Sequence, residues 1–168
     1  MSEKYELIGN KLIIFDEELN INLVSNLEVH KKSAYHFNKK LFYQMYYHDD
    51  ILHGPSIFYN KQGGIISIAW FFEGKRYGKA KKYYANGKLY SLERYFDDFF
   101  EEKQEYYFEN GKIKSCINYK KGLLDGEVNL FYENENLKRK LFFKKGKKLQ
   151  DNIFDEDENL IDEKNFSI

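Results

Sequence analysis

Aromatic and aliphatic residues recur along this chain with a step of 24 residues, separated by polar positions. One aromatic column comprises Tyr35, Tyr59, Tyr83, Tyr107 and Phe131, and a second comprises Tyr47, Phe71, Tyr95, Tyr119 and Phe143. An aliphatic column lies between them, at Leu41, Ile65, Leu89, Ile113 and Leu137. Gly54, Gly78 and Gly126 keep the same step, with Glu102 at the intermediate phase. Matched columns without insertions indicate an array of five repeats.

Each repeat contains the signals of two short strands and two turns. The Asn86-Gly87 pair stands between an aromatic run and an aliphatic run, which is a strong hairpin signal because both residues tolerate positive φ. A second turn follows in each unit, as in Glu73-Gly74-Lys75, Lys121-Gly122-Leu123 and Lys145-Gly146-Lys147. No stretch between the turns shows a helical period. The pattern therefore predicts an all-β protein, an elongated and twisted antiparallel meander of tandem 24-residue β-hairpin repeats.

Side-chain alternation predicts the register of each hairpin. A three-residue loop from Ala85 to Gly87 pairs Tyr83 with Leu89, whereas a two-residue loop pairs Tyr83 with Tyr90. We favour the three-residue loop, because it is expected to collect all three apolar columns on one face. Ser67, Ser91 and Ser115 then share that face and leave room between the rings.

The ends of the chain differ from the repeats. Residues 14–21 and 154–161 resemble each other, and atypical polar units commonly close a repeat array. We expect an N-terminal cap hairpin over residues 1–29, five repeats over residues 30–149, and an acidic C-terminal cap or tail over residues 150–168.

The charge balance and the single cysteine exclude several classes. Lys and Arg number 27 and equal Asp and Glu, so electrostatic binding of nucleic acid is disfavoured, and contact with a membrane surface meets the same limit. One cysteine cannot form an internal disulfide, which is typical of a reducing compartment. Residues 1–18 fit neither a signal peptide nor a membrane span. We expect a cytoplasmic protein.

No motif of an enzyme is found: the chain lacks a nucleophile elbow, a zinc-protease helix, a phosphate loop and a dinucleotide fingerprint. His30, His36, His48 and His53 lie near Asp49 and Asp50, but their spacing matches no established metal motif, and solvated or capping histidines are the favoured interpretation. Cys116 is expected to be a packed side chain. We predict no catalytic residue, no metal and no cofactor.

The second strands of the repeats carry a further pattern on the face opposite the predicted core. Alternate positions are apolar in the N-terminal half and basic in the C-terminal half. The basic run over residues 138–148 is interpreted as keeping an exposed sheet soluble rather than as stacking bases. The apolar part must be covered, either by the N-terminal cap or sheet curling, or by a partner with Trp70 as an anchor. The predicted partner-binding residues are Tyr46, Ile66, Ile68, Trp70, Phe72, Tyr90, Leu92, Phe96, Lys114, Lys120, Lys138, Lys140 and Lys144.

Units such as Gly78-Lys79-Ala80-Lys81-Lys82-Tyr83-Tyr84-Ala85-Asn86-Gly87-Lys88-Leu89, followed by Tyr95, resemble MORN repeats, and in particular the bacterial repeat variant. The resemblance covers residues 29–149. It departs from the pattern at Asn38-Lys39-Lys40, Gln62-Gly63-Gly64 and Asn134-Glu135-Asn136.

The resemblance implies a single-layer hairpin array used for protein or lipid contacts, without intrinsic catalysis, and some bacterial members are antitoxin or immunity proteins. The predicted function is therefore a non-enzymatic protein-binding module, an antitoxin or immunity protein that blocks a toxin by binding. The alternative is a structural or scaffold protein, in one form membrane-associated, whose partner is a component of an assembly.

Overall fold

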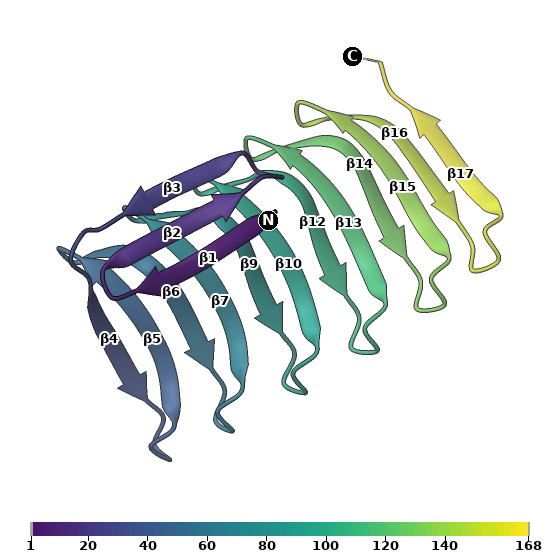
Figure 1. The fold of residues 1–168 in the computed structure, drawn as a ribbon. Coiled ribbons are helices and arrows are strands. Elements are labelled where there is room, and N and C mark those ends of the chain that lie inside the picture. Colours follow the sequence, from purple (N-terminus) through teal and green to yellow (C-terminus); the bar gives the residue numbers. More distant parts are fainter. Residues whose placement is uncertain (1, 168) are drawn as a thin grey trace.

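The turns and alternating strands predicted from the sequence build a long antiparallel sheet with a small sheet lying on it (Figure 1). The structure is a computed structural model that describes residues 2–167, and within that range it contains strands and turns but no helix. Successive strands of the long sheet are neighbours in space, so the chain runs as a meander from one edge to the other. The all-β antiparallel meander of hairpins is thus confirmed.

The small sheet consists of three strands. They are β1 (Glu3–Ile8), β2 (Lys11–Asp16) and β3 (Ile21–Ser25). The strands of the large sheet are β4 (His30–Tyr35), β5 (Leu41–His48), β6 (Ile51–Tyr59), β7 (Ile65–Phe72), β8 (Lys75–Arg76), β9 (Gly78–Tyr83), β10 (Leu89–Phe96), β11 (Phe99–Phe100), β12 (Glu102–Tyr107), β13 (Ile113–Lys120), β14 (Leu123–Phe131), β15 (Leu137–Lys144), β16 (Lys147–Phe154) and β17 (Leu160–Asn165). The two-residue strands β8 and β11 pair only with β7 and β10.

Turns of one geometry line one long edge of the sheet, which we call the turn edge. They span residues 36–40, 60–64, 84–88, 108–112, 132–136 and 155–159. In the third turn the N–H of Tyr84 donates to the carbonyl of Lys88 (2.8 Å) and that of Gly87 to the carbonyl of Tyr84 (2.9 Å). Gly87 has a φ of +83°, which glycine adopts without strain. Tyr83 consequently lies opposite Leu89, as the three-residue loop predicts.

The prediction that all three apolar columns share one face is wrong. The register shifts between Leu89 and Ser91, leaving Tyr90 as an extra residue, and an equivalent shift occurs in every other hairpin of the large sheet that closes at the turn edge. A bulge inserts one residue and so reverses the alternation of the residues beyond it. The first aromatic column and the aliphatic column therefore lie on one face, and the second aromatic column lies with the serines on the other.

The opposite ends of the strands are joined by tight two-residue turns. Both residues of each turn have positive φ, as in Glu73 (+48°) and Gly74 (+84°) or Asp97 (+53°) and Asp98 (+70°). Two consecutive left-handed residues form the type I′ turn, whose twist matches that of the flanking strands. Aspartate therefore replaces glycine in two of these turns, at Asp50 and Asp98, and both residues of each turn keep positive φ.

The N-terminal segment folds as a three-stranded sheet, whereas a hairpin was expected. It lies across the face of the large sheet over β5 to β10, rather than beyond its end (Figure 1). The C-terminal segment, expected to be an acidic cap or tail, forms β16, a turn and β17, which continue the array as a further hairpin. The two outer edges of the large sheet are therefore β4 and β17.

Candidate protein-binding face

The face of the large sheet beneath the N-terminal sheet, called the covered face, carries much of the apolar set identified in the sequence. Leu12, Ile14, Leu19 and Ile21 of the small sheet form a cluster that is at most 5 % exposed. Against it pack Tyr5, Leu7 and Leu23 of the small sheet and Trp70, Phe72 and Tyr77 of the large one. The N-terminal cap therefore covers this part of the apolar face, one of the two alternatives that the sequence left open.

Tyr5 places the small sheet on the large one through contact with a glycine. Its ring stacks on Trp70, with 5.9 Å between ring centroids. Its ring also lies so close to Gly78 that a Cβ atom there would be 2.2 Å from Cε1 of Tyr5. The Tyr5 hydroxyl accepts a hydrogen bond from the N–H of Lys79 (3.0 Å) and donates one to the buried carboxylate of Asp16. Burial and Asp16 raise the pKa of Tyr5 well above its ordinary value, so the phenol keeps its proton.

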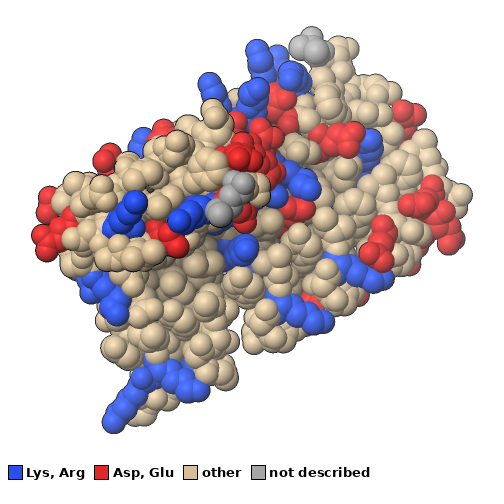
Figure 2. Space-filling model, viewed as in Figure 1, with Lys and Arg blue, Asp and Glu red and all other residues tan. Residues whose placement is uncertain are grey.

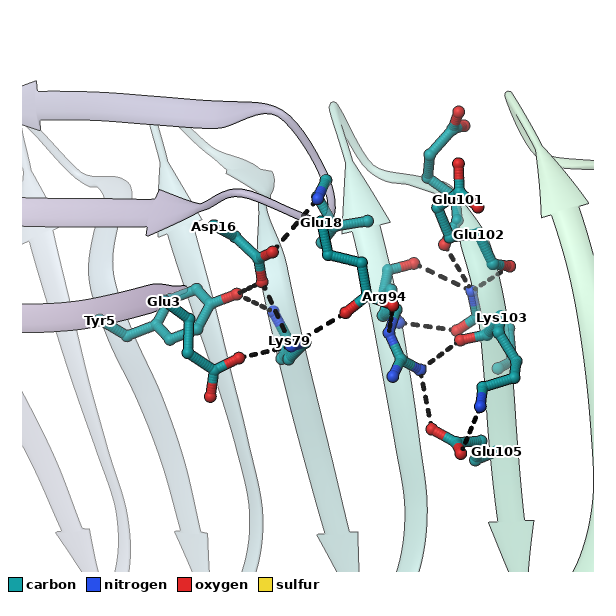
Figure 3. A network of polar contacts seen from close by, with 12 residues as sticks. Glu3, Tyr5, Asp16, Glu18, Lys79, Arg94, Glu101, Glu102, Lys103 and Glu105 are labelled. Atoms are coloured by element: carbon teal, nitrogen blue, oxygen red, sulfur yellow. Dashed lines mark hydrogen bonds and ion pairs between the residues drawn. The ribbon is translucent and has the colours of Figure 1, made fainter. Parts of the chain in front are cut away.

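A polar network joins the two sheets beside the apolar cluster (Figure 3). The Lys79 ammonium pairs with Glu3, with Glu18 (3.1 Å) and with Asp16 (3.6 Å). Burial alone would lower the pKa of Lys79, but these carboxylates raise it above its ordinary value. A charged lysine is thus retained where β1, β2 and the turn after β2 meet the large sheet.

Arg94 continues the network across β10 to β12. It is 5 % exposed and pairs with Glu18 (3.2 Å) and Glu105 (3.0 Å), and it donates to the carbonyl of Lys103. Gln104, which is fully buried, accepts from the N–H of Arg94 (2.7 Å) and donates to its carbonyl (3.2 Å). The side chain thereby replaces backbone pairing, since β10 and β12 pair only at Ser91 and Leu92.

The partner-binding residues predicted from the sequence are not brought together as a single open surface. Trp70 and Phe72 contact the cluster of the small sheet, and a Cβ at Gly54 would touch both Tyr46 and Leu7. Ile68 and Phe96 line two separate hollows at the border of the small sheet. The other apolar members are Ile66 and Leu92, which are half-buried, and Tyr90, which is 37 % exposed.

The basic members lie beyond the small sheet, on β13 and β15. Lys140 pairs with Glu127 (2.8 Å) and Lys144 with Asp125 (2.9 Å), whereas Lys114, Lys120 and Lys138 are exposed. The strip is therefore partly neutralised within the chain. Its role in binding a partner stays a prediction, as does that of the apolar members.

A groove runs from the small sheet to the turn edge between β7 and β9. One hollow of about 280 Å³ is lined by Glu3, Tyr5, Ile65, Ile68, Trp70, Lys79, Lys81 and Tyr83. A second hollow of about 470 Å³ is lined by Asn60, Gln62, Gly64, Ile65, Tyr83, Ala85, Asn86 and Gly87. Ile65 and Tyr83 line both hollows, which therefore form one continuous groove.

Two small residues in the turn over residues 60–64 account for the outer hollow. In other units the first turn residue reaches the following unit: the hydroxyl of Tyr84 donates to the carbonyl of Tyr107 (2.7 Å), and that of Tyr132 to the carbonyl of Phe154 (3.0 Å). Asn60 is shorter, and its side chain accepts from the N–H groups of Gln62 and Gly64 in its own turn. The equivalent of Gly64 is lysine or asparagine in the four other turns with the same spacing.

The groove combines an apolar floor with an unpaired positive charge. Lys81 is half-buried and forms no ion pair or side-chain hydrogen bond with any residue between 2 and 167. The three turns nearest the groove, 36–40, 60–64 and 84–88, contain lysines but no acidic residue. Lys81, Ile65 and Tyr83 were missed as site residues, and the only sequence signal for the hollow was the departure from the repeat pattern at Gln62-Gly63-Gly64.

Of the four histidines, His48 and His53 lie side by side, with 6.3 Å between ring centroids, and they do not have the arrangement of a metal site. His53 is 1 % exposed; its Nδ1 accepts from the N–H of Glu73 (3.1 Å), and its Nε2 has no partner in the described chain. Burial, with the nearby His48, lowers the pKa of His53. Residues 2–167 contain no group of three or more His, Cys, Asp or Glu side chains placed to hold a metal ion. Burial raises the pKa of the half-buried Cys116 thiol, which disfavours the reactive thiolate.

Comparison with known families bears on the central units of this array. Three segments match the MORN repeat variant. They are residues 76–97, 103–121 and 124–145, which extend from β8 into the turn after β15. No curated protein matches the chain. Residues 2–167 contain no helix long and apolar enough to cross a membrane. The first matched segment includes the β9 side of the groove, and the turn with Asn60 and Gly64 on the other side precedes it.

Proposed function

We propose that this protein is a non-enzymatic repeat module that binds a protein partner, and that the groove between β7 and β9 receives an extended segment of that partner. The observation that carries the proposal is the groove itself, where the turn over residues 60–64 lacks the side chain that reaches the following unit elsewhere in the array. Its floor is formed by Ile65, Ile68 and Tyr83, which together offer apolar surface to a ligand. MORN repeats are modules for such contacts, which agrees with this use.

The chemistry of the groove indicates the kind of segment that fits it. Asn60 and Gly64 leave the place that an aromatic side chain occupies in neighbouring units, so an aromatic residue of the partner can fill it. Lys81 favours a negative partner, because its ammonium has no counterion among residues 2–167 and can form a charge-assisted pair with a carboxylate. The proposed ligand is therefore an extended peptide segment that carries an aromatic residue and a nearby carboxylate.

The finer proposal is that the partner is a toxin and that this protein acts as an antitoxin or immunity protein by covering the toxin's working surface. Occlusion needs only a binding surface and no catalytic residue, which agrees with a groove built from packed and charged side chains. The second candidate is a scaffold that holds a component of a larger assembly. An array with two long edges and two faces supports it, because such surfaces can engage several partners.

Two substitutions test the groove without removing a core side chain. Asn60→Tyr introduces the side chain that Tyr84 has in the next unit and should fill the outer hollow. Lys81→Glu reverses the charge at the inner hollow. Lys147→Glu, on the exposed surface of β16 and outside the predicted partner-binding set, is the matched control for a charge reversal.

The partner is isolated from an extract of the host with the wild-type chain, and its affinity for each variant is measured by calorimetry. We expect binding to weaken at least about tenfold for Asn60→Tyr and Lys81→Glu, and to change little for Lys147→Glu. Equal affinities of all four chains would refute the groove as the binding site. Co-expression then separates the two candidates: a toxin partner arrests growth unless this protein is present, whereas an assembly component does not.

A further inference from the structure

The six turns of the turn edge change sign of charge from one end of the molecule to the other. Their formal charges, in chain order, are +2, +1, +1, 0, −2 and −4. The first turn owes its charge to Lys39 and Lys40, and the last to the run of acidic residues over 155–158. Figure 2 shows blue side chains at the lower left, where the first turns lie, and red side chains at the right, near β16 and β17. The chain is neutral overall but has two ends of opposite charge.

The charges of the terminal turns are not neutralised within the chain. Lys39 forms no ion pair in the range that the structure describes, and Lys40 donates only to the carbonyl of Gln62. Glu156 and Asp157 likewise form no ion pair there. Turn 132–136 next to them is also negative, so the neighbouring units repel this end rather than stabilise it.

Both ends of the large sheet also have open strand edges. β4 pairs only with β5, and β17 pairs only with β16. The first strand of the array, β4, leads into a turn at the turn edge, and the last strand, β17, follows such a turn. The array therefore consists of whole hairpins. A strand of the β4 type placed beside β17 would have the antiparallel direction that each internal junction has, as between β15 and β16.

Apolar side chains are exposed at the same two ends. Phe37 in the first turn is fully exposed and Tyr35 on β4 is 63 % exposed. At the other end Leu160 and Ile161 are 52 % and 63 % exposed. Proteins usually place charged side chains on open strand edges to prevent pairing with another chain. Between two copies this protection works only when the charges that meet have the same sign. Here the edges that would meet have opposite signs.

We propose that the protein assembles head to tail with further copies of itself: β17 of one copy pairs with β4 of the next, and the acidic turn 155–159 lies beside the basic turn 36–40. Each interface continues the sheet, supplies hydrogen-bond partners to both open edges and brings together charges that lack partners within one chain. Because the interface is formed by two different surfaces, each added copy leaves a further surface free, and the interface can repeat to produce a series of oligomers beyond the dimer.

The register of the internal junctions defines the expected contacts. Between β15 and β16, Lys140 lies opposite Asn152. In the proposed junction β17 takes the place of β15 and β4 of the next copy takes the place of β16. Glu163 then lies opposite Ser33 of the next copy, beside Lys32. Lys164 would lie opposite Lys32. Each of these lysines has its own carboxylate, Asp162 at 2.8 Å and Asp50 at 2.7 Å, so the pair brings no isolated like charges together.

Sedimentation velocity of the full chain tests the proposal over a range of protein concentration and salt. At low salt we expect oligomers that grow beyond a dimer as the concentration rises. Raising the salt from about 0.01 M to about 1 M shortens the Debye length from about 30 Å to about 3 Å and should dissociate them. Glu156→Lys with Asp157→Lys at one end, or Lys31→Glu with Lys39→Glu at the other, should each weaken association at least about tenfold.

Mixing the two double variants is the decisive measurement. Each variant alone loses the attraction between the turns that meet, because turn 155–159 changes from −4 to 0 in one variant and turn 36–40 changes from +2 to 0 in the other. In an equimolar mixture the unaltered acidic turn of one variant can meet the unaltered basic turn of the other, so that one interface of opposite charge is restored between the two chains. Association that returns on mixing supports the proposal and also shows that both variants are folded. The proposal is overturned if the wild-type chain stays monomeric at all concentrations in low salt, if its assembly stops at a dimer, or if the charge reversals leave association unchanged.

Discussion

Replacing Gly78 by alanine tests how the N-terminal sheet is held on the large one. Gly78 has a φ of +77°, and an added Cβ would lie 2.2 Å from Cε1 of Tyr5. Gly87 has a nearly equal φ of +83°, but a Cβ there would meet no atom within 4 Å. The two alanine variants therefore share the backbone strain and differ only in the contact with Tyr5.

The magnitudes follow from these two differences. The left-handed backbone costs alanine about 1–2 kcal/mol, which is the whole effect expected for Gly87→Ala. In Gly78→Ala the Tyr5 ring must also move, which leaves the buried Asp16 carboxylate short of a hydrogen bond, at about 1–3 kcal/mol. Loss of the stacking of Tyr5 on Trp70 adds about 1 kcal/mol. We expect Gly78→Ala to lower the free energy of unfolding by about 3–6 kcal/mol.

Urea unfolding followed by tryptophan fluorescence measures this difference directly, because Trp70 is the only tryptophan and touches Tyr5. Circular dichroism of the same samples reports the large sheet. Release of the small sheet alone would appear as an early fluorescence change and as faster proteolysis in the connection over residues 26–29. If Gly78→Ala loses no more stability than Gly87→Ala, the contact with Tyr5 does not hold the two sheets together, and the reasoning fails.

Three further substitutions test other parts of the structure. Trp70→Ala should lower the free energy of unfolding by about 2–4 kcal/mol, because the ring packs against the small sheet. Circular dichroism in urea measures this loss, and an unchanged stability would mean that Trp70 is an exposed anchor. Burial lowers the pKa of His53 in the folded protein, so below about pH 6.5, the ordinary pKa of histidine, the unfolded chain binds a proton at this site more readily than the folded one. The free energy of unfolding should therefore fall as the pH drops from about 6.5 towards the lower pKa of the folded state. Urea midpoints at successive pH values, with His53→Gln as the control, measure this loss, and an equal slope in both chains would contradict it. Asp151→Asn should lower the free energy of unfolding by about 1–3 kcal/mol, since the buried carboxylate accepts two hydrogen bonds of 2.7 Å from Arg139. Asp162→Asn, whose side chain is 41 % exposed, should lower it little. Equal shifts of the melting temperature in the two variants would show that the buried pair adds no stability.

Local chemistry along the chain determined the repeat, the strand type and the turns. The 24-residue step, the Asn-Gly pairs and the pairing of Tyr83 with Leu89 depend on residues close together in sequence, whose backbone preferences act within one hairpin. Two of the three matched MORN-like segments contain an Asn-Gly pair, and the third has Asn134-Glu135 at the same place in its turn. The absence of a helical period likewise sufficed to predict an all-β fold.

The assignment of residues to faces needed the tertiary structure. A bulge of one residue at Tyr90 and its equivalents reverses the side-chain alternation, and period-two reasoning has no means to place that extra residue. The cover over Trp70 also depends on Tyr5 and Gly78, which are 73 positions apart in the chain. No local preference connects such residues, because their contact is decided by how two complete sheets pack.

The groove and the charged ends show the same division. The chain contains Asn60, Gly64 and the lysines and acidic residues of the six turns in plain view, but their effects arise only when the units are stacked. A missing side chain creates a hollow only where a neighbouring unit lies beside it, and the signs of the turn charges form a gradient only when the turns line one edge. Sequence determined each unit of this protein, and the stacking of units decided which of its surfaces are covered and which are open.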